Sequence, residues 1–334
     1  MITNKYRYNI IDGSWLLKRN CSLSFSFFKR DPENNIFTPG KVLTSFIQSI
    51  NKFARDYGVT ADKVIICWDM WDGPSGYYTS QVLAGEYKDD RKYYTEADLD
   101  NPDLTDEQKK EIELEVLRND VQRKAKYMIK SDLWKYGIPS IYEAGYEADQ
   151  IVWVLANMLN SQDKPSIITS ADSDWSYLVT PNVDYFKAPL RGAEPKILTY
   201  AESVSQKMPE DLVGKISLYD YKSMYDSLES SHNAMRRTRK EGSDTNDVIR
   251  QIVNSGDYSG VEDLRRYNLQ LSTFDISQFP KFQKVLDMVN TLDKIGGLAP
   301  VEEFRMFSDS AGMTVSDSYY MKFRDRLDPS LYRS

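Results

Sequence analysis

The chain has 334 residues, of which 41% are hydrophobic and 28% are charged, and its formal net charge at pH 7 is −7. This is an ordinary globular composition, and the acidic balance argues against a simple basic protein that coats DNA. No apolar run approaches the roughly 18–20 residues that a membrane span needs, and the chain does not begin like a signal peptide. We therefore expect a cytoplasmic protein without membrane contacts.

The chain contains one histidine, His232, and two cysteines, Cys21 and Cys67. A three-histidine zinc site and an HExxH protease helix are therefore impossible, and a Ser-His-Asp triad would have to use His232. Two cysteines make neither a disulfide framework nor a zinc site by themselves. Any bound metal must be held mainly by oxygen atoms, which favours magnesium, manganese or calcium.

The first half of the chain alternates between expected strands and expected helices. Residues 8–12 and 63–69 read as short apolar strands, and residues 42–57 between them have helical spacing. A charged insert follows at about 85–135, with a helix start signal at Thr105-Asp-Glu-Gln. Residues 166–170 read as a third strand. This alternation predicts a central, mostly parallel sheet with helices on both faces.

Past about residue 200 the pattern changes to helical segments. Apolar residues recur at core-facing spacing between 282 and 292, and a polar loop at 236–246 interrupts the segments. We expect an α/β catalytic domain at 1–200, including the insert at 85–135, and a helical subdomain at 201–334.

Six carboxylates follow the expected strands or open a helix: Asp12, Asp69, Glu147, Asp149, Asp172 and Asp174. Ligands of an open parallel sheet bind outside the carboxyl ends of its strands, so these side chains meet if the strands are neighbours. Like charges about 4 Å apart repel by about 1–4 kcal/mol per pair. Two divalent cations would relieve this repulsion, activate a water and stabilise the leaving oxygen of a phosphodiester.

Each carboxylate also has a plainer interpretation. An aspartate after a strand is more often a turn residue or a helix cap. Glu147 and Asp149 could act only through the dipole of the helix that they open. The recurrence of one arrangement in four separate segments is what favours a metal site.

Four sequence blocks around these carboxylates resemble the 5′-nuclease (flap endonuclease) family. They are Ile10-Ile-Asp12-Gly-Ser, Cys67-Trp-Asp69 with Tyr87-Lys-Asp-Asp-Arg91, Tyr146-Glu-Ala-Asp149, and Ser170-Ala-Asp172-Ser-Asp174-Trp. Their order and spacing match the family over about residues 8–190, and the likeness is greatest to phage members of the ribonuclease H type. The resemblance implies a PIN-like fold, a helical arch in the insert and a helix-hairpin-helix-like C-terminal subdomain.

The resemblance also implies a flap endonuclease or 5′–3′ exonuclease that uses two magnesium ions, for which manganese can substitute. The six carboxylates would bind the metals, and Lys88 and Arg91 at the base of the arch would hold the scissile phosphate. The alternative for these two cations is a surface ion pair with Asp89 or Asp90. The implied substrates are DNA with 5′ flaps or ends and RNA–DNA hybrid in phage replication. A single-strand-binding protein or a sliding clamp is left open as a partner.

The chain departs from the family pattern at three places. Gln150 stands where the family often has a second aspartate. The basic residue that the family usually has shortly before the block Tyr87-Lys-Asp-Asp-Arg91 is not evident in this chain. In the hairpin region, Glu229 and His232 replace two aspartates. Histidine is a poorer magnesium ligand than a carboxylate, so these two residues either complete a weaker metal site or are solvated helix residues.

Basic residues form two further groups. Arg123, Lys126 and Lys130 share a face of the expected insert helix and could line a gateway for a single strand. Arg236, Arg237, Arg239 and Lys240 form a denser loop patch that could grip duplex phosphates. Both groups could equally be solvated surface. Two other interpretations of the whole chain are a PIN-like ribonuclease and a nucleic-acid-binding protein of the same fold with weakened catalysis.

Overall fold

The structure, a computed structural model, describes residues 5–59, 61–70, 94–131, 138–189, 194–229, 244–257, 306 and 309–312. Within these residues the centre of the fold is a six-stranded sheet of order β3-β2-β1-β4-β5-β6. Its strands are β1 (Tyr6–Asp12), β2 (Ala61–Cys67), β3 (Ser140–Ile141), β4 (Ser166–Ser170), β5 (Val183–Lys187) and β6 (Lys196–Leu198). Strands β1 to β5 pair in parallel and β6 pairs antiparallel with β5, which confirms the predicted mostly parallel sheet.

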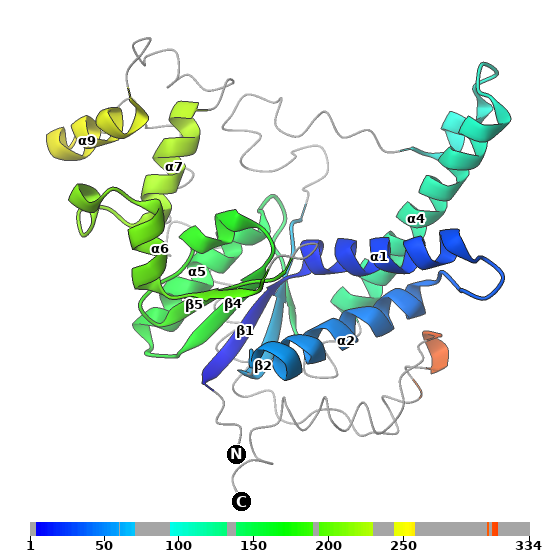
Figure 1. The fold of residues 1–334 in the computed structure, drawn as a ribbon, viewed down its shortest axis with the longest axis horizontal. Helices are drawn as coiled ribbons and strands as arrows, with labels where there is room; N and C mark the ends of the chain where they lie inside the picture. The colour runs from blue at the N-terminus through cyan, green and yellow to red at the C-terminus, as the bar shows by residue number, and fades with distance from the viewer. Residues whose placement is uncertain are drawn as a thin grey trace, which may run out of the picture.

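Helices cover both faces of the sheet (Figure 1). On one face lie α1 (Gly13–Arg30), α2 (Pro39–Tyr57) and α4 (Asp106–Ser131), and on the other lies α5 (Ala148–Ser161). Neighbouring residues of β1 show the division, because Ile10 packs with the α5 core and Ile11 packs with the core of α1 and α2. A parallel sheet buried on both faces requires such continuous apolar strands.

The helix boundaries follow local capping chemistry. At the start of α4, the Gln108 backbone N–H donates to the Thr105 hydroxyl at 3.2 Å, and the Thr105 N–H donates to the Gln108 side chain at 2.9 Å. This reciprocal pair confirms the helix start that the sequence predicts in the insert. The expected helix at 42–57 is confirmed as part of α2.

Beyond residue 198 the described chain is mainly helical, as expected. It contains α6 (Tyr200–Lys207), the short 3-10 helix η5 (Glu210–Leu212), α7 (Leu218–Glu229) and α9 (Thr245–Ser255). Apolar residues of these helices share the core of α5. The apolar repeat at 282–292 lies outside the described residues, and the domain boundary at 200 stays a prediction.

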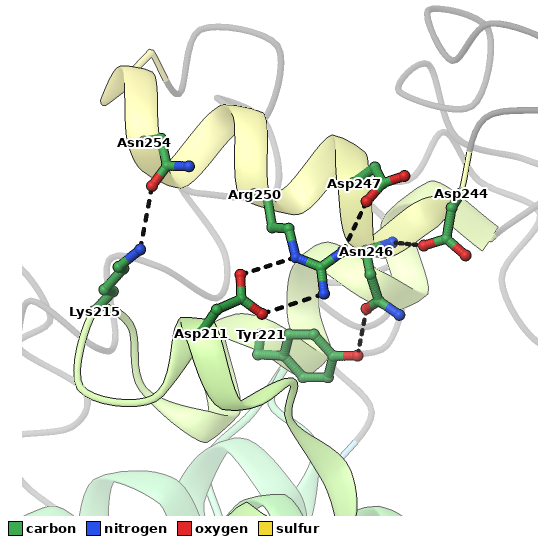
Figure 2. Close-up of polar contacts among 8 residues, drawn as sticks. All are labelled: Asp211, Lys215, Tyr221, Asp244, Asn246, Asp247, Arg250 and Asn254. Atoms are coloured by element: carbon green, nitrogen blue, oxygen red, sulfur yellow. Dashed lines mark hydrogen bonds and ion pairs between the residues drawn. The ribbon is translucent and has the colours of Figure 1, made fainter.

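Polar contacts fasten α9 to η5 and α7 (Figure 2). Arg250 on α9 donates to both Asp211 carboxylate oxygens, at 2.8 and 3.2 Å, and to Asp247 at 2.7 Å. The Tyr221 hydroxyl donates to the Asn246 side chain at 2.8 Å, and Ile249 of α9 is fully buried. An apolar anchor with a polar rim thus places α9 on the rest of the fold.

Both cysteines are buried and have free thiols. In the described part of the chain, no helix has the length and apolar character needed to cross a membrane.

Gly13, directly after Asp12, leaves no room for a side chain. A Cβ atom there would lie 2.5 Å from Ile66 Cγ2 and 2.7 Å from Trp68 Cδ2, both in the core. We expect Gly13→Ala to lower the free energy of unfolding by about 1–3 kcal/mol, because it overpacks the junction between β1 and α1. Urea unfolding measures this change. Ser14→Ala is the control, and an equal effect of both variants would contradict the explanation.

Candidate active site

Three adjacent strands bring Asp12, Asp69 and Asp172 to the same side of the sheet, where the parallel strands have their carboxyl ends. We call this the carboxyl edge of the sheet. Asp12 is the last residue of β1 and pairs in register with Cys67, the last residue of β2. Asp69 follows the end of β2, and Asp172 follows the end of β4 on the other side of β1. The expectation that these strands are neighbours is therefore confirmed, and the carboxyl ends of parallel strands are where such a fold binds ligands.

Asp12 is the buried centre of this edge. One carboxylate oxygen accepts from the Trp15 backbone N–H at 2.9 Å, which caps α1, and the other accepts from the Ser170 hydroxyl at 2.9 Å. Burial, aided by the charges of Asp69 and Asp172, raises the pKa of Asp12 to about 7 despite the lowering effect of the two hydrogen bonds. An anion held in this position is costly, and a cation would relieve that cost.

Ser170 and Tyr185 hold the segment that carries Asp172. The Asp172 N–H donates to the Ser170 hydroxyl at 3.0 Å, and the Tyr185 hydroxyl donates to the Asp172 carbonyl at 2.7 Å. Burial raises the pKa of Tyr185 well above its usual value, so this hydroxyl stays a donor. The sequence interpretation gave neither residue a role. Ser170 lies inside the quoted block, whereas the sequence around Tyr185 carries no signal.

The start of α5 is bound to the loop after β2. The Ala148 N–H donates to an Asp69 carboxylate oxygen at 2.9 Å. Glu147 is the N-cap of α5, and its carboxylate is part of a capping box whose partner is Gln150. The Glu147 N–H donates to the Gln150 side chain at 2.8 Å, and Asp149 accepts from the Gln150 N–H. Gln150 is thus a buried structural residue of this cap.

Two lysines of α4 lie beside this edge of the sheet. The Lys126 ammonium donates to the Asp69 carbonyl at 3.3 Å, and burial lowers the pKa of Lys126 although the charge of Asp69 raises it. The Lys130 ammonium lies 3.4 Å from the centre of the Tyr142 ring. Burial and then the charge of Lys126 lower the pKa of Lys130 to about 8. Lys126 therefore lies close enough to Asp69 to interact with its charge, whereas Lys130 contacts Tyr142 and the Met70 sulfur.

Arg123, the third expected member of this basic face, has a different environment. Its side chain is 76% exposed and forms an ion pair with Asp120 at 2.6 Å. Asp174, on the opposite side of the edge, pairs with Lys222 of α7 at 3.3 Å. The sequence interpretation missed Lys222, because its distance from Asp174 along the chain leaves no local signal.

Several expected site residues lie outside the described part of the structure. These are Lys88, Arg91, His232, Arg236, Arg237, Arg239 and Lys240. Glu229 ends α7, but its side chain is also outside what the structure describes. Their expected roles stay predictions.

Among the described residues, no three or more histidine, cysteine, aspartate or glutamate side chains form a group that could hold a metal ion. The carboxylates at the edge instead accept hydrogen bonds from nearby N–H and O–H groups. For example, an Asp172 carboxylate oxygen accepts from the Asp174 N–H at 3.0 Å. The side chains at this edge nevertheless offer a metal only oxygen ligands, which magnesium prefers. Their chemistry therefore fits a divalent cation.

The raised pKa of Asp12 predicts how stability depends on pH. Between about pH 4 and 7 the folded protein keeps a proton on Asp12 that the unfolded chain releases, so the metal-free protein loses stability as pH rises through this range. We expect Asp12→Asn, which can still cap α1, to raise the free energy of unfolding at pH 8 by roughly 2–4 kcal/mol, with the gain vanishing near pH 4.

Urea unfolding in the presence of a chelator, repeated across that pH range, measures the effect. Asp103→Asn is the control, because it removes an exposed carboxylate and leaves the edge of the sheet unchanged. A loss of stability in Asp12→Asn at pH 8 would contradict the explanation.

The N-terminal part of the chain matches a known protein family. The family model described as "5′-3′ exonuclease, N-terminal resolvase-like domain" matches residues 7–209. A comparison with curated protein sequences gives no match.

Three solved structures illustrate the likeness. The T5 D15 protein co-crystallised with metal ions is 15% identical, with 96% of this chain and 98% of that chain covered and a TM-score of 0.47. The catalytic core of Rad2 in complex with DNA substrate is 14% identical, with coverages of 98% and 94% and a TM-score of 0.42. Human GEN1 in complex with Holliday junction DNA is 13% identical, with coverages of 96% and 71% and a TM-score of 0.40.

These TM-scores are below 0.5, so the family assignment rests on the sequence model, which covers more than half of the chain. The chain therefore belongs to the 5′–3′ exonuclease family, whose members are nucleases that hydrolyse phosphodiesters.

Proposed function

We propose that the protein is a magnesium-dependent 5′-nuclease that cuts phosphodiesters with two metal ions. One observation carries the proposal. Asp12, Asp69 and Asp172 arrive from three neighbouring strands, and burial together with the charges of Asp69 and Asp172 raises the pKa of Asp12 to about 7. Clustered carboxylates with a strongly raised pKa at the ligand-binding edge of a parallel sheet are typical of a catalytic cation site.

The six carboxylates Asp12, Asp69, Glu147, Asp149, Asp172 and Asp174 would hold the cations, and manganese can substitute for magnesium. When bound, two divalent cations supply the Lewis acidity that activates a water and stabilises the leaving 3′-oxygen. The chain itself orients the carboxylates: the Ser170 hydroxyl holds Asp12, and the Ala148 N–H holds Asp69. In this proposal Glu229 and His232 add weaker ligands.

Nucleic acid would approach from the side of α4. Lys126 lies beside Asp69, Lys130 follows it by one turn of α4, and both could neutralise phosphate oxygens close to the cut. Lys88 and Arg91 would hold the scissile phosphate. Arg123 would contact phosphates farther away, and the basic patch of Arg236, Arg237, Arg239 and Lys240 would hold the duplex.

The proposed substrates are DNA with 5′ flaps or ends and RNA–DNA hybrid, as in primer removal during phage DNA replication in the host cytoplasm. In this scheme residues 1–200 form the catalytic domain, 85–135 the arch and 201–334 the helical DNA-binding subdomain. A single-strand-binding protein or a sliding clamp would be its protein partner.

Cleavage of an end-labelled 5′-flap DNA tests the proposal. We expect magnesium-dependent release of the flap by the wild-type protein and a loss of at least about 100-fold in rate for Asp149→Asn, because even groups that only orient metal ligands contribute 10- to 100-fold. Asp184→Asn is a matched control. It removes a carboxylate that belongs to β5 and pairs with Lys5, away from the carboxyl edge.

The same assay distinguishes the alternatives. Cleavage restricted to RNA would favour a PIN-like ribonuclease. Binding of the flap without cleavage in magnesium or manganese would favour a nucleic-acid-binding role and contradict the proposed mechanism.

A further inference from the structure

The ion pair between Lys222 and Asp174 joins α7 to the edge of carboxylates. The Lys222 nitrogen lies 3.3 Å from an Asp174 oxygen, and the Lys222 side chain is 14% exposed whereas that of Asp174 is 55% exposed. The Lys222 side chain is therefore mostly buried, while the Asp174 side chain still faces solvent. A positive charge of the protein itself thus lies beside a carboxylate that the proposed function assigns to a metal.

Aromatic packing holds this cation in place. The Lys222 ammonium lies 5.8 Å from the centre of the Tyr177 ring, and the Lys207 ammonium lies 5.2 Å from the same ring. Tyr177 belongs to η4 (Ser173–Tyr177), the same short 3-10 helix that contains Asp174. Lys222 therefore contacts η4 through both a ring and a carboxylate, and both contacts favour keeping the ammonium beside Asp174.

We propose that Lys222 is an internal counter-ion that competes with a divalent cation for Asp174, an inference that rests on the proposed function. A metal ion at Asp174 would lie close to the ammonium and be repelled by it, since the mostly buried Lys222 side chain cannot swing away into water. Lys222 thus weakens the metal ion that uses Asp174. Once metal has bound, a phosphate of the nucleic acid backbone is the anion that could take the place of Asp174 beside Lys222.

Manganese binding to the full chain, without nucleic acid, tests the inference. Electron paramagnetic resonance of free Mn²⁺ gives the number of bound ions and their dissociation constants. We expect Lys222→Met to bind the weaker of two ions about 10-fold more tightly than the wild type, which corresponds to about 1.4 kcal/mol. Asp174 is half exposed, so water can solvate it in the variant and we expect the fold to persist.

Lys207→Met is the matched control, because it removes the same charge from the same aromatic ring. Unchanged or weaker manganese binding in Lys222→Met, or an equal gain in Lys207→Met, would overturn the inference. If Lys222→Met is unfolded by circular dichroism, Lys222→Gln is measured in its place, with tighter binding expected and unchanged binding counting against the inference. Failure of the wild type to bind manganese would instead refute the proposed metal site itself.

Discussion

The burial of a carboxylate among other carboxylates at the ends of parallel strands is the constraint on which this structure depends. Asp12 is buried between Asp69 and Asp172, and its raised pKa records the cost of placing negative charge there. Two hydrogen bonds to Asp12 offset only part of that cost. A fold that retains such an arrangement gives up stability in the absence of a cation, which is the usual relation between stability and function at catalytic sites.

The two apolar cores make this arrangement possible. α1, α2 and α4 cover one face of the sheet and α5 covers the other, so β1 and its neighbours are fixed from both sides (Figure 1). Helix capping then uses the same residues as the site. Asp12 caps α1, Glu147 caps α5, and the Asp69 carboxylate accepts from the first turn of α5. The caps therefore orient the carboxylates as well as beginning the helices.

Positive charge reaches the edge from both sides. Lys126 and Lys130 come from α4, next to β2 and β3, while Lys222 comes from α7 and meets Asp174 after β4. These cations moderate the negative potential that would otherwise repel a nucleic acid backbone. The helical half of the chain thus takes part in the electrostatics of the edge as well as sharing its core with α5.

The sequence predicted the alternation of strands and helices, the helix start at Thr105 and the positions of the carboxylates after strands. These features could be predicted because periodicity and capping depend on residues close together in the chain. The sequence could not predict the order of the strands, the inward placement of Lys126 or the pairing of Lys222 with Asp174. Those features arise from contacts between segments distant in sequence, and burial, which sets the charge of Asp12, exists only once the chain has packed.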